Sequence, residues 1–423
     1  MLDCKLVGTN AHGAVCRQAL LFLGRGVKKV RTASSSYRFL LLIFVVLIAG
    51  LSQGLLLPLL TILLEKSGVS SGMNGLNAVA LYIGMFLIML VIEKPVRKFG
   101  YKRVIILGIM LVMAATLLFP LWKNLVFWFA LRMLVGMGDS ALHYSSQLWI
   151  TSTSPAEKRG RNISIYGMAY AIGFSIGPLG INLMSFGVWV PFAVIGGCFG
   201  LALLLLLKMP HEYPVREEKN APAKSRYIGA IRIAWFALFP ALLYGYMESS
   251  MNSNFPVYGL RMGISESWVS VLLPAFGIGS LILQIPLGLW SDRKGRKQVL
   301  MLAGFAGGLA FLSVPLFGNN VWGILFAFIA AGGLVGSFYS LGLAYVADLV
   351  PKAYLPAANV IASINFSVGS IIGPNLGGLG IQYVSPGSMF YFLGSMFLLF
   401  IGLGFFFQRT KQEEKTSLIR FTN

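Results

Sequence analysis

The stretch GLWSDRKGRK (residues 288–297) places a short charged segment between two long apolar runs. The first run covers about residues 269–290, and the second begins near residue 299. Both are long enough to cross a bilayer, so the segment between them is expected to be a tight turn at the membrane surface. Gly288 and Gly295 lack a Cβ, which permits close backbone approach and positive φ there. The basic residues of the charged segment would hold the turn against anionic lipid headgroups.

The composition of the whole chain agrees with a membrane location. The chain is 57% hydrophobic and 11% charged, with a mean hydropathy of +0.76, whereas soluble domains average about 25% charged residues. The net charge of +20 would suggest nucleic acid in a soluble protein. In a membrane protein it indicates basic loops on one side, so no nucleic-acid partner is expected.

Nothing in the chain predicts a catalytic centre. The three cysteines, Cys4, Cys16 and Cys198, have neither metal-ligand spacing nor the number for a disulfide framework. Nucleophile-elbow, phosphate-loop and zinc-protease motifs are absent from the sequence. We therefore expect a protein that is not an enzyme and has no metal or cofactor.

Apolar runs of about 20 residues recur along the chain, which is the length that spans a core of about 30 Å. They predict twelve helices, at about residues 39–63, 75–92, 104–122, 125–149, 162–184, 188–208, 229–255, 267–290, 299–317, 320–346, 357–381 and 387–408.

Basic residues cluster in the loops after the second, fourth and eighth runs, and the opposite loops hold only Lys66, Lys123 and Arg261. The basic side is therefore expected to be cytoplasmic, with both termini on it. The predicted parts are a basic leader (1–36), a six-helix bundle (37–208), a linker (209–228), a second bundle (229–408) and a tail (409–423).

The two halves repeat one another. Gly177-Pro178 matches Gly373-Pro374 at an offset of 196, and Gly100 matches Gly295 at an offset of 195. Self-similarity at a fixed offset between two six-helix blocks indicates internal pseudo-symmetry.

Residues 288–297 resemble the signature loop of the major facilitator superfamily, G-x-L-x-D-R-x-G-R-K, with Trp290 in place of the usual Leu. A plain solvated basic turn is the alternative. The resemblance implies an all-α membrane protein, with twelve transmembrane helices in two pseudo-symmetric six-helix bundles around a central cavity. It also implies a secondary transporter that works by alternating access.

Two further motifs resemble patterns of this family. Gly173-x-x-x-Gly177-Pro178 in the fifth run is similar to the antiporter motif, although an upstream Gly is Ser164 and one residue, not two, separates Pro178 from Gly180. Gly369, Gly373 and Pro374 repeat it in the eleventh run. Glycines four residues apart also suit ordinary close packing of membrane helices, which is the alternative.

The fourth run contains Arg132-x-x-x-Gly136-x-Gly138, similar to a family motif whose Arg is linked to proton coupling. Arg132, Asp139 and His143 share one helical stripe. Charges inside a span are costly and face a cavity or a partner, and a His titrates near neutral pH. We expect these three to take part in coupling; alternatively, Arg132 and Asp139 form a structural pair and His143 is a bystander.

Glu248 lies in a polar part of the seventh run, residues 244–254. Such a run predicts a helix that faces an aqueous cavity, and it makes Glu248 a candidate to bind a cation or a proton. If the helix ended early, Glu248 would be a loop acid instead.

The first-half copy of the charged loop has Arg97 where the second half has Asp292, and Ser152 where the second half has Asp348. This joint difference predicts that Asp292, Arg296 and Asp348 act as one cluster near the fifth helix. With Gly288, Arg293 and Gly295 they form the expected cytoplasmic gate. Its contacts would be worth a few kcal/mol if partly buried, and the Arg296–Asp348 contact would form only when the cytoplasmic side is closed.

The sequence thus predicts proton-coupled export of small amphipathic compounds, as in the drug:proton antiporter branch. The alternative is ion-coupled uptake or facilitated transport of a sugar or other metabolite; a membrane enzyme or receptor is disfavoured. The expected partners are a small-molecule substrate, protons and the lipid bilayer. The protein is expected to be a monomer and a multi-pass protein of the cell membrane.

Overall fold

The computed structural model describes residues 12–213, 224–351 and 354–407, and they are built of helices. The helices of the first half are α1 (His12–Lys66), α2 (Ser71–Met89), α3 (Glu93–Leu118), η1 (Phe119–Leu121), α4 (Leu125–Thr153), α5 (Ala156–Ile176), η2 (Gly177–Phe186) and α6 (Val190–Leu207). Those of the second half are α7 (Lys224–Arg261), α8 (Glu266–Lys294), α9 (Arg296–Ser313), η3 (Val314–Phe317), α10 (Val321–Val335), α11 (Phe338–Leu349), α12 (Leu355–Tyr383) and α13 (Ser388–Phe406).

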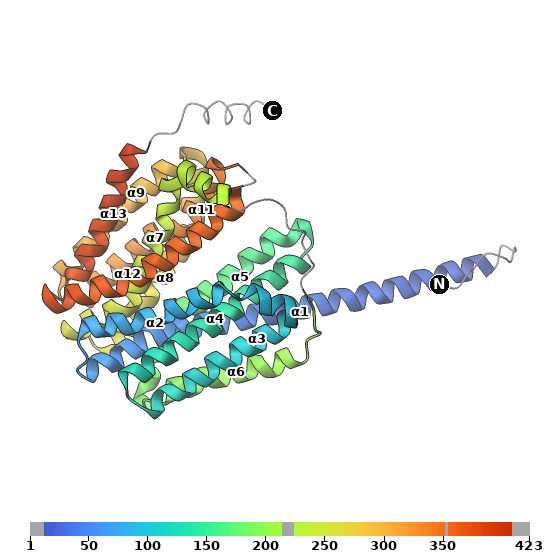
Figure 1. Ribbon diagram of the computed structural model, residues 1–423, viewed down its shortest axis with the longest axis horizontal. Coiled ribbons are helices and arrows are strands. Elements are labelled where there is room, and N and C mark those ends of the chain that lie inside the picture. Colours follow the sequence, from blue (N-terminus) through green and yellow to red (C-terminus); the bar gives the residue numbers. More distant parts are fainter. Residues whose placement is uncertain (1–11, 214–223, 352–353, 408–423) are drawn as a thin grey trace.

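Twelve spans in the described residues are long and apolar enough to cross a membrane, which confirms the all-helical fold. The fifth span consists of α5 with the 3-10 helix η2, and the tenth consists of α10 with α11, so α12 and α13 are the eleventh and twelfth. Figure 1 shows the two halves as two bundles lying side by side, the first in blue and green and the second in yellow to red.

The ends of the bundles differ from the expected boundaries. Helix α1 begins at His12, well before the expected first span, and its early part projects from the bundle (Figure 1). Residues 224–228, expected in the linker, already belong to α7. Residues 1–11 of the leader, the middle of the linker and the tail at 409–423 lie outside the described residues.

Glycines let helices within each half approach backbone to backbone. A Cβ at Gly84 of α2 would collide with the carbonyl oxygen of Met133 on α4, and one at Gly136 with that of Leu81. Pairs of small residues of this kind allow the close helix packing typical of membrane bundles.

The second half repeats this packing at the repeat offset. A Cβ at Gly279 of α8 would collide with the carbonyl of Ile329 on α10, and one at Gly332 with that of Phe276. The pseudo-symmetry expected from the sequence is therefore present in the backbone contacts.

The helix continues differently after each of the two repeated Gly-Pro pairs. After Gly177, Pro178 has no N–H to continue the α-helical bonds, and the chain goes on as the 3-10 helix η2. At the matching position, Pro374 stays inside α12, which continues to Tyr383.

The halves are joined at the ends of the spans away from the basic loops, which we call the far side. There Arg261 Nε lies 2.8 Å from Glu65 Oε1, and Lys66 pairs with Glu266. Two hydrogen bonds also cross the boundary, from Asn182 Nδ2 to Ser270 Oγ (2.8 Å) and from the Gly72 N–H to Gln382 Oε1 (3.0 Å).

Toward the opposite end, which we call the basic side, the facing helices α5 and α8 have open space around their glycines. A Cβ at Gly160, Gly167 or Gly288 would meet no atom within 4 Å. Farther along the same two helices, a Cβ at Gly277 would collide with Ser175. The structure is therefore a conformation closed on the far side.

We predict that Gly84→Ala lowers the thermal stability of the detergent-solubilised protein, because the new methyl group meets a backbone carbonyl that cannot move by itself. Overpacking of this kind costs about 1–3 kcal/mol. The measurement is the midpoint of thermal aggregation followed by size-exclusion chromatography.

Gly197→Ala is the matched control, since a Cβ at exposed Gly197 on α6 meets no atom within 4 Å. It makes the same change inside a helix and should leave the midpoint unchanged or raised. Equal midpoints for the two variants would contradict the packing argument.

Candidate functional site

Three ionisable side chains lie on α4, one after another along its length. Arg132 and Asp139 are separated by about 10 Å along the helix axis. Among the described residues the Arg132 guanidinium has no hydrogen-bond partner, and the Asp139 carboxylate accepts from Gln53 instead, so the alternative of an Arg132–Asp139 pair is wrong. His143 is one turn beyond Asp139, with its Nε2 3.6 Å from Asp139 Oδ2.

Asp139 is 2% exposed, and its carboxylate accepts a hydrogen bond from Gln53 Nε2 of α1. The Gln53 Oε1 atom in turn accepts a bond of 2.8 Å from the Tyr170 hydroxyl on α5. The Tyr170 ring packs edge-on against the His143 ring, with centroids 4.8 Å apart. His143 Nδ1 also lies 2.8 Å from the Tyr166 hydroxyl. Helices α1, α4 and α5 thus build one polar cluster inside the first half.

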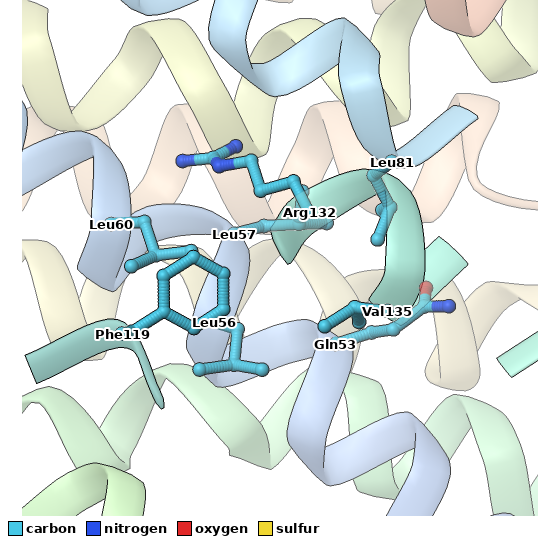
Figure 2. Close-up of a pocket in the computed structure, with 8 residues that line it drawn as sticks. All are labelled: Gln53, Leu56, Leu57, Leu60, Leu81, Phe119, Arg132 and Val135. Carbon is cyan, nitrogen blue, oxygen red and sulfur yellow. The ribbon is translucent and has the colours of Figure 1, made fainter. Parts of the chain in front are cut away.

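Arg132 lies apart from this cluster, nearer the far side. It is 2% exposed, and its three guanidinium nitrogens have no hydrogen-bond partner among the described residues. Its side chain lines a small, mostly apolar pocket (Figure 2), whose other residues are Gln53, Leu56, Leu57, Leu60, Leu81, Phe119 and Val135. Tyr82 of α2 lies within electrostatic range of the guanidinium.

Glu248 lies inside α7, which continues to Arg261, so it is not a loop acid. It is half-buried and is within electrostatic range of three tyrosines: Tyr244 on its own helix, and Tyr82 and Tyr170 on the first half. Glu248 therefore sits where the two halves face each other.

Tyr244, one helical turn before Glu248 on α7, packs with aromatic rings from two other helices of the second half. Tyr244 of α7, Tyr339 of α11 and Phe366 of α12 form a triangle with ring centroids 5.9–6.2 Å apart. Rings and a carboxylate together suit an organic cation, which is attracted by the π faces as well as by the charge.

The polar run around Glu248 does not line a cavity as a whole, contrary to the expectation. Ser249, Ser250, Ser253 and Asn254 are each at most 2% exposed. The Asn254 amide donates to the Gly373 carbonyl of α12 (3.2 Å), and the serines bond mainly within α7. The hydroxyl and amide groups of this run form hydrogen bonds within α7 or with α12. Most of these polar residues therefore pack between the two helices.

The glycine motifs have this packing role in both halves. Cβ atoms at Gly173 and Gly177 would collide with the backbone of α1, beside Leu47 and Leu51. In the second half, Cβ atoms at Gly369 and Gly373 would collide with the carbonyls of Leu242 and Tyr246 on α7. The α1–α5 pair is thus repeated by α7–α12.

The charged loop of residues 288–297 forms the turn between α8 and α9. Gly295 has φ +96°, a conformation that favours glycine, while Gly288 has open space around it. Arg296 lies between two acids, 2.6 Å from Asp292 Oδ1 and 3.1 Å from Asp348 Oδ2, while Arg293 is exposed. The structure thus brings together Asp292, Arg296 and Asp348.

The first half has a neutral version of this cluster. Tyr101, the repeat equivalent of Arg296, donates from its hydroxyl to Ser152 Oγ (3.1 Å), and Ser152 is the equivalent of Asp348. The lysine that follows has the same role in both halves. Lys102 Nζ donates to the carbonyls of Leu207 and Met209 (2.7 and 2.6 Å) at the C-terminal end of α6, and Lys297 Nζ donates to that of Phe407 (2.6 Å) just after α13.

Two expectations about the charged cluster need correction. The Asp292–Arg296 and Arg296–Asp348 bonds lie within the second half and are formed although the structure is closed on the far side, so this contact does not require a closed basic side. The Asp292 and Asp348 side chains are 54% and 56% exposed, so each pair is worth at most about 1 kcal/mol rather than several.

Comparison with known proteins decides the family. The model of the Major Facilitator Superfamily matches residues 42–277 and 262–421, which is most of the chain. The chain belongs to this superfamily. It is therefore a membrane transporter and not an enzyme.

Among curated superfamily members, the chain is 40% identical over 363 residues to the uncharacterized transporter YfkF of Bacillus subtilis, covering 85% of this chain and 92% of YfkF. It is 23% identical over 374 residues to the uncharacterized transporter YcaD of Shigella flexneri, covering 86% and 94%.

Solved structures show the same fold. A mutant of the nucleoside transporter NupG superposes with a TM-score of 0.72 at 15% identity, covering 87% of this chain and 99% of that one. A bacterial homologue of the human lysosomal transporter Spinster, in an inward-facing conformation, superposes with a TM-score of 0.62 at 18% identity, covering 88% and 93%.

Sequence reasoning missed several residues of the polar cluster in this superfamily member. Gln53, Tyr166 and Tyr170 stand in apolar runs and match no motif quoted above, yet they contact Asp139 and His143. A polar amide in the middle of a 30-residue span was the one available signal for Gln53.

We predict that Asp292→Asn and Asp348→Asn each lower the free energy of unfolding by up to about 1 kcal/mol. Their double variant should lose less than the sum, because both acids bind the one guanidinium of Arg296. Thermal unfolding of the solubilised protein measures the three values. As a control, Asp348→Asn combined with Glu93→Gln should be additive, since Glu93 pairs with Arg97 in the other half. Additive loss in the first pair as well would reject a single cluster.

Proposed function

We propose that this transporter is a proton-coupled antiporter that exports small amphipathic cations, with Glu248 as the acid that binds the substrate and Asp139 with His143 as the proton site. The observation that carries the proposal is the position of Glu248. It is a carboxylate inside a span, half-buried, beside aromatic rings and facing both halves of the molecule.

A carboxylate at this depth needs a counter-charge. Ionisable groups within spans are costly and face a cavity or a partner, and no ion pair involves Glu248 in the described residues. An organic cation supplies the missing charge and buries its apolar part against Tyr244, Tyr339 and Phe366. A proton supplies the charge when the substrate is absent.

The Asp139 cluster supports proton coupling. Asp139 is buried in the first half and its partner Gln53 is neutral, so a change in the charge of Asp139 is felt strongly by its surroundings. His143 stands 3.6 Å from it as a second proton acceptor. The two acids belong to different halves, so rocking of the halves changes the surroundings of both.

The direction of transport rests on sidedness and on the glycine motif. Because basic loops favour the cytoplasmic side of a membrane, we take the basic side as cytoplasmic, so that both described ends of the chain face inward and the far side faces outward. The conformation closed on the far side is then the inward-facing state of a protein in the cell membrane. We take the motif at Gly173, Gly177 and Pro178 as support for antiport, and a monomer as the working unit.

Uptake of a polar metabolite is the second candidate. The cluster of Tyr82, Tyr170, Tyr244 and Tyr339 offers both flat rings and hydroxyls, which suits a ring-shaped polar solute such as a sugar or a nucleoside. NupG is a nucleoside transporter by its title, and at 15% identity its likeness supports the fold alone.

We predict that everted membrane vesicles containing the protein accumulate ethidium when their lumen is acidified, because exchange for outgoing protons drives a cation inward. Glu248→Gln should reduce this uptake at least about tenfold, the effect of 1.4 kcal/mol of lost interaction. Asp139→Asn should abolish the dependence on the proton gradient while the protein still folds. The measurement is ethidium fluorescence before and after collapse of the gradient.

Glu93→Gln is the control, because Glu93 is an exposed acid paired with Arg97. It should leave uptake unchanged. No gradient-driven uptake of ethidium or of other lipophilic cations, combined with uptake of a sugar or nucleoside in the opposite direction, would favour the second candidate.

A further inference from the structure

The Tyr166 hydroxyl faces two polar atoms of the same residue, His143. It lies 2.8 Å from His143 Nδ1 and 3.2 Å from the backbone carbonyl oxygen of His143. Tyr166 belongs to α5 and is 6% exposed, while His143 belongs to α4. A hydroxyl has one proton, so Tyr166 donates to only one of these two atoms at a time and is free to accept from the other when that atom is a ring N–H.

The other ring nitrogen of His143 faces the Asp139 carboxylate. His143 Nε2 lies 3.6 Å from Asp139 Oδ2, which is an ion-pair distance but too long for a hydrogen bond. Asp139 Oδ2 also accepts a hydrogen bond from Gln53 Nε2 of α1, and such a bond favours the ionised carboxyl group. A neutral His143 therefore directs its Nε2–H toward Asp139 and its Nδ1 lone pair toward Tyr166.

We propose that His143 holds the exchanged proton as an imidazolium, that Asp139 remains its counter-ion, and that Tyr166 is the positioning residue for both forms of the ring. The inference rests on the proposed function, in which Asp139 and His143 form the proton site. The proton binds at Nδ1, the ring nitrogen that faces the Tyr166 hydroxyl.

Rotation of one hydroxyl accommodates the proton. In the neutral form, the Tyr166 O–H donates to the lone pair of Nδ1. When Nδ1 takes up a proton, the new N–H donates to the Tyr166 oxygen, and the Tyr166 O–H turns to the carbonyl oxygen of His143. The partners for both forms are already in place in the structure. Loss of the proton reverses the rotation.

Access and charge both favour His143 over Asp139 as the carrier. The His143 side chain is 23% exposed and that of Asp139 is 2% exposed, so water reaches the ring more readily than the carboxylate. With Asp139 ionised and His143 neutral, the site holds one buried negative charge, and the added proton converts it into a neutral ion pair. Gln53 donates to the carboxylate and Tyr166 accepts from the imidazolium, so each charged group keeps the hydrogen-bond partner that a buried pair needs.

The ionisable groups around the ring come from two helices. Among the described residues, those that form an ion pair, a hydrogen bond or a ring contact with His143 are Asp139 on α4, and Tyr166 and Tyr170 on α5. The Tyr170 ring packs edge-on, and its hydroxyl donates to Gln53. From α1, the neutral Gln53 contacts Asp139. Protonation of this site is therefore governed by His143 and Asp139.

NMR of the histidine ring nitrogens in the isotope-labelled, purified full chain tests the proposal, because their chemical shifts report both the tautomer and the charge of a ring. The chain has three histidines, so His12→Gln with His211→Gln leaves His143 as the single signal. We expect a neutral ring protonated at Nε2 at about pH 9 and an imidazolium at about pH 5, on either side of the range in which histidine usually titrates.

Tyr166→Phe removes the hydroxyl and keeps the ring. The proton affinity of His143 should fall at least about threefold, because the imidazolium loses a charge-assisted bond and the neutral ring loses only a weaker one. Asp139→Asn removes the counter-ion and should lower the affinity about tenfold or more. Tyr258→Phe is the matched control, because its hydroxyl also bonds to a backbone carbonyl, that of Gly318 (3.2 Å), but on the far side. It should leave the affinity unchanged.

The outcomes separate this inference from the proposed function. A wild-type ring that stays neutral between about pH 9 and about pH 5, or whose neutral form is protonated at Nδ1, overturns the inference even where the proton gradient drives ethidium uptake. This result needs no change at Tyr166, so it decides the matter even where Tyr166→Phe fails to fold. Equal falls in Tyr166→Phe and Tyr258→Phe overturn the role of Tyr166. The expected titration in a protein whose vesicles show no proton-driven exchange overturns the proposed function and, with it, the exchange of this proton.

Discussion

Backbone contact between helices is the constraint on which the rest of the structure depends. At Gly84 and Gly136 in the first half, and at Gly279 and Gly332 in the second, a single methyl group would collide with the carbonyl of the facing helix. Helices packed this closely cannot slide past one another without breaking many contacts at once. The proposed transport cycle therefore moves each half as a unit, with the substrate bound at the surface between them.

The polar groups divide according to this constraint. The polar groups of α7 around residues 249–254 are buried and hydrogen-bonded within the tight α7–α12 pair. A polar run within a span therefore does not by itself mark a cavity. Glu248 is not buried in this helix pair, because its position on α7 turns it toward the first half. Asp139 is held inside its own half by Gln53, and Arg132 has no hydrogen-bond partner among the described residues. Asp139 and Glu248 thus belong to different halves of the molecule.

The two halves use the same frame with different chemistry at the basic side. A neutral Tyr101–Ser152 bond stands where the second half has Arg296–Asp348, while Lys102 and Lys297 hold the ends of the sixth and last spans in the same manner. The parallel shows that the joint difference at Asp292 and Asp348 reflects one local cluster. Because these acids are half-exposed, the cluster shapes the loop more than it stabilises the fold.

The sequence by itself determined the twelve spans, the two-half repeat, the side that holds the basic loops and the presence of Arg132, Asp139, His143 and Glu248 inside spans. Hydropathy and helical periodicity are local properties, so they can be read along the chain. Only the tertiary structure decided which groups meet. Gln53 and Asp139 are 86 positions apart, and Tyr170 and Gln53 are 117. Such pairs depend on the rotation and depth at which helices pack, and those are set by contacts between elements rather than by any one stretch of sequence.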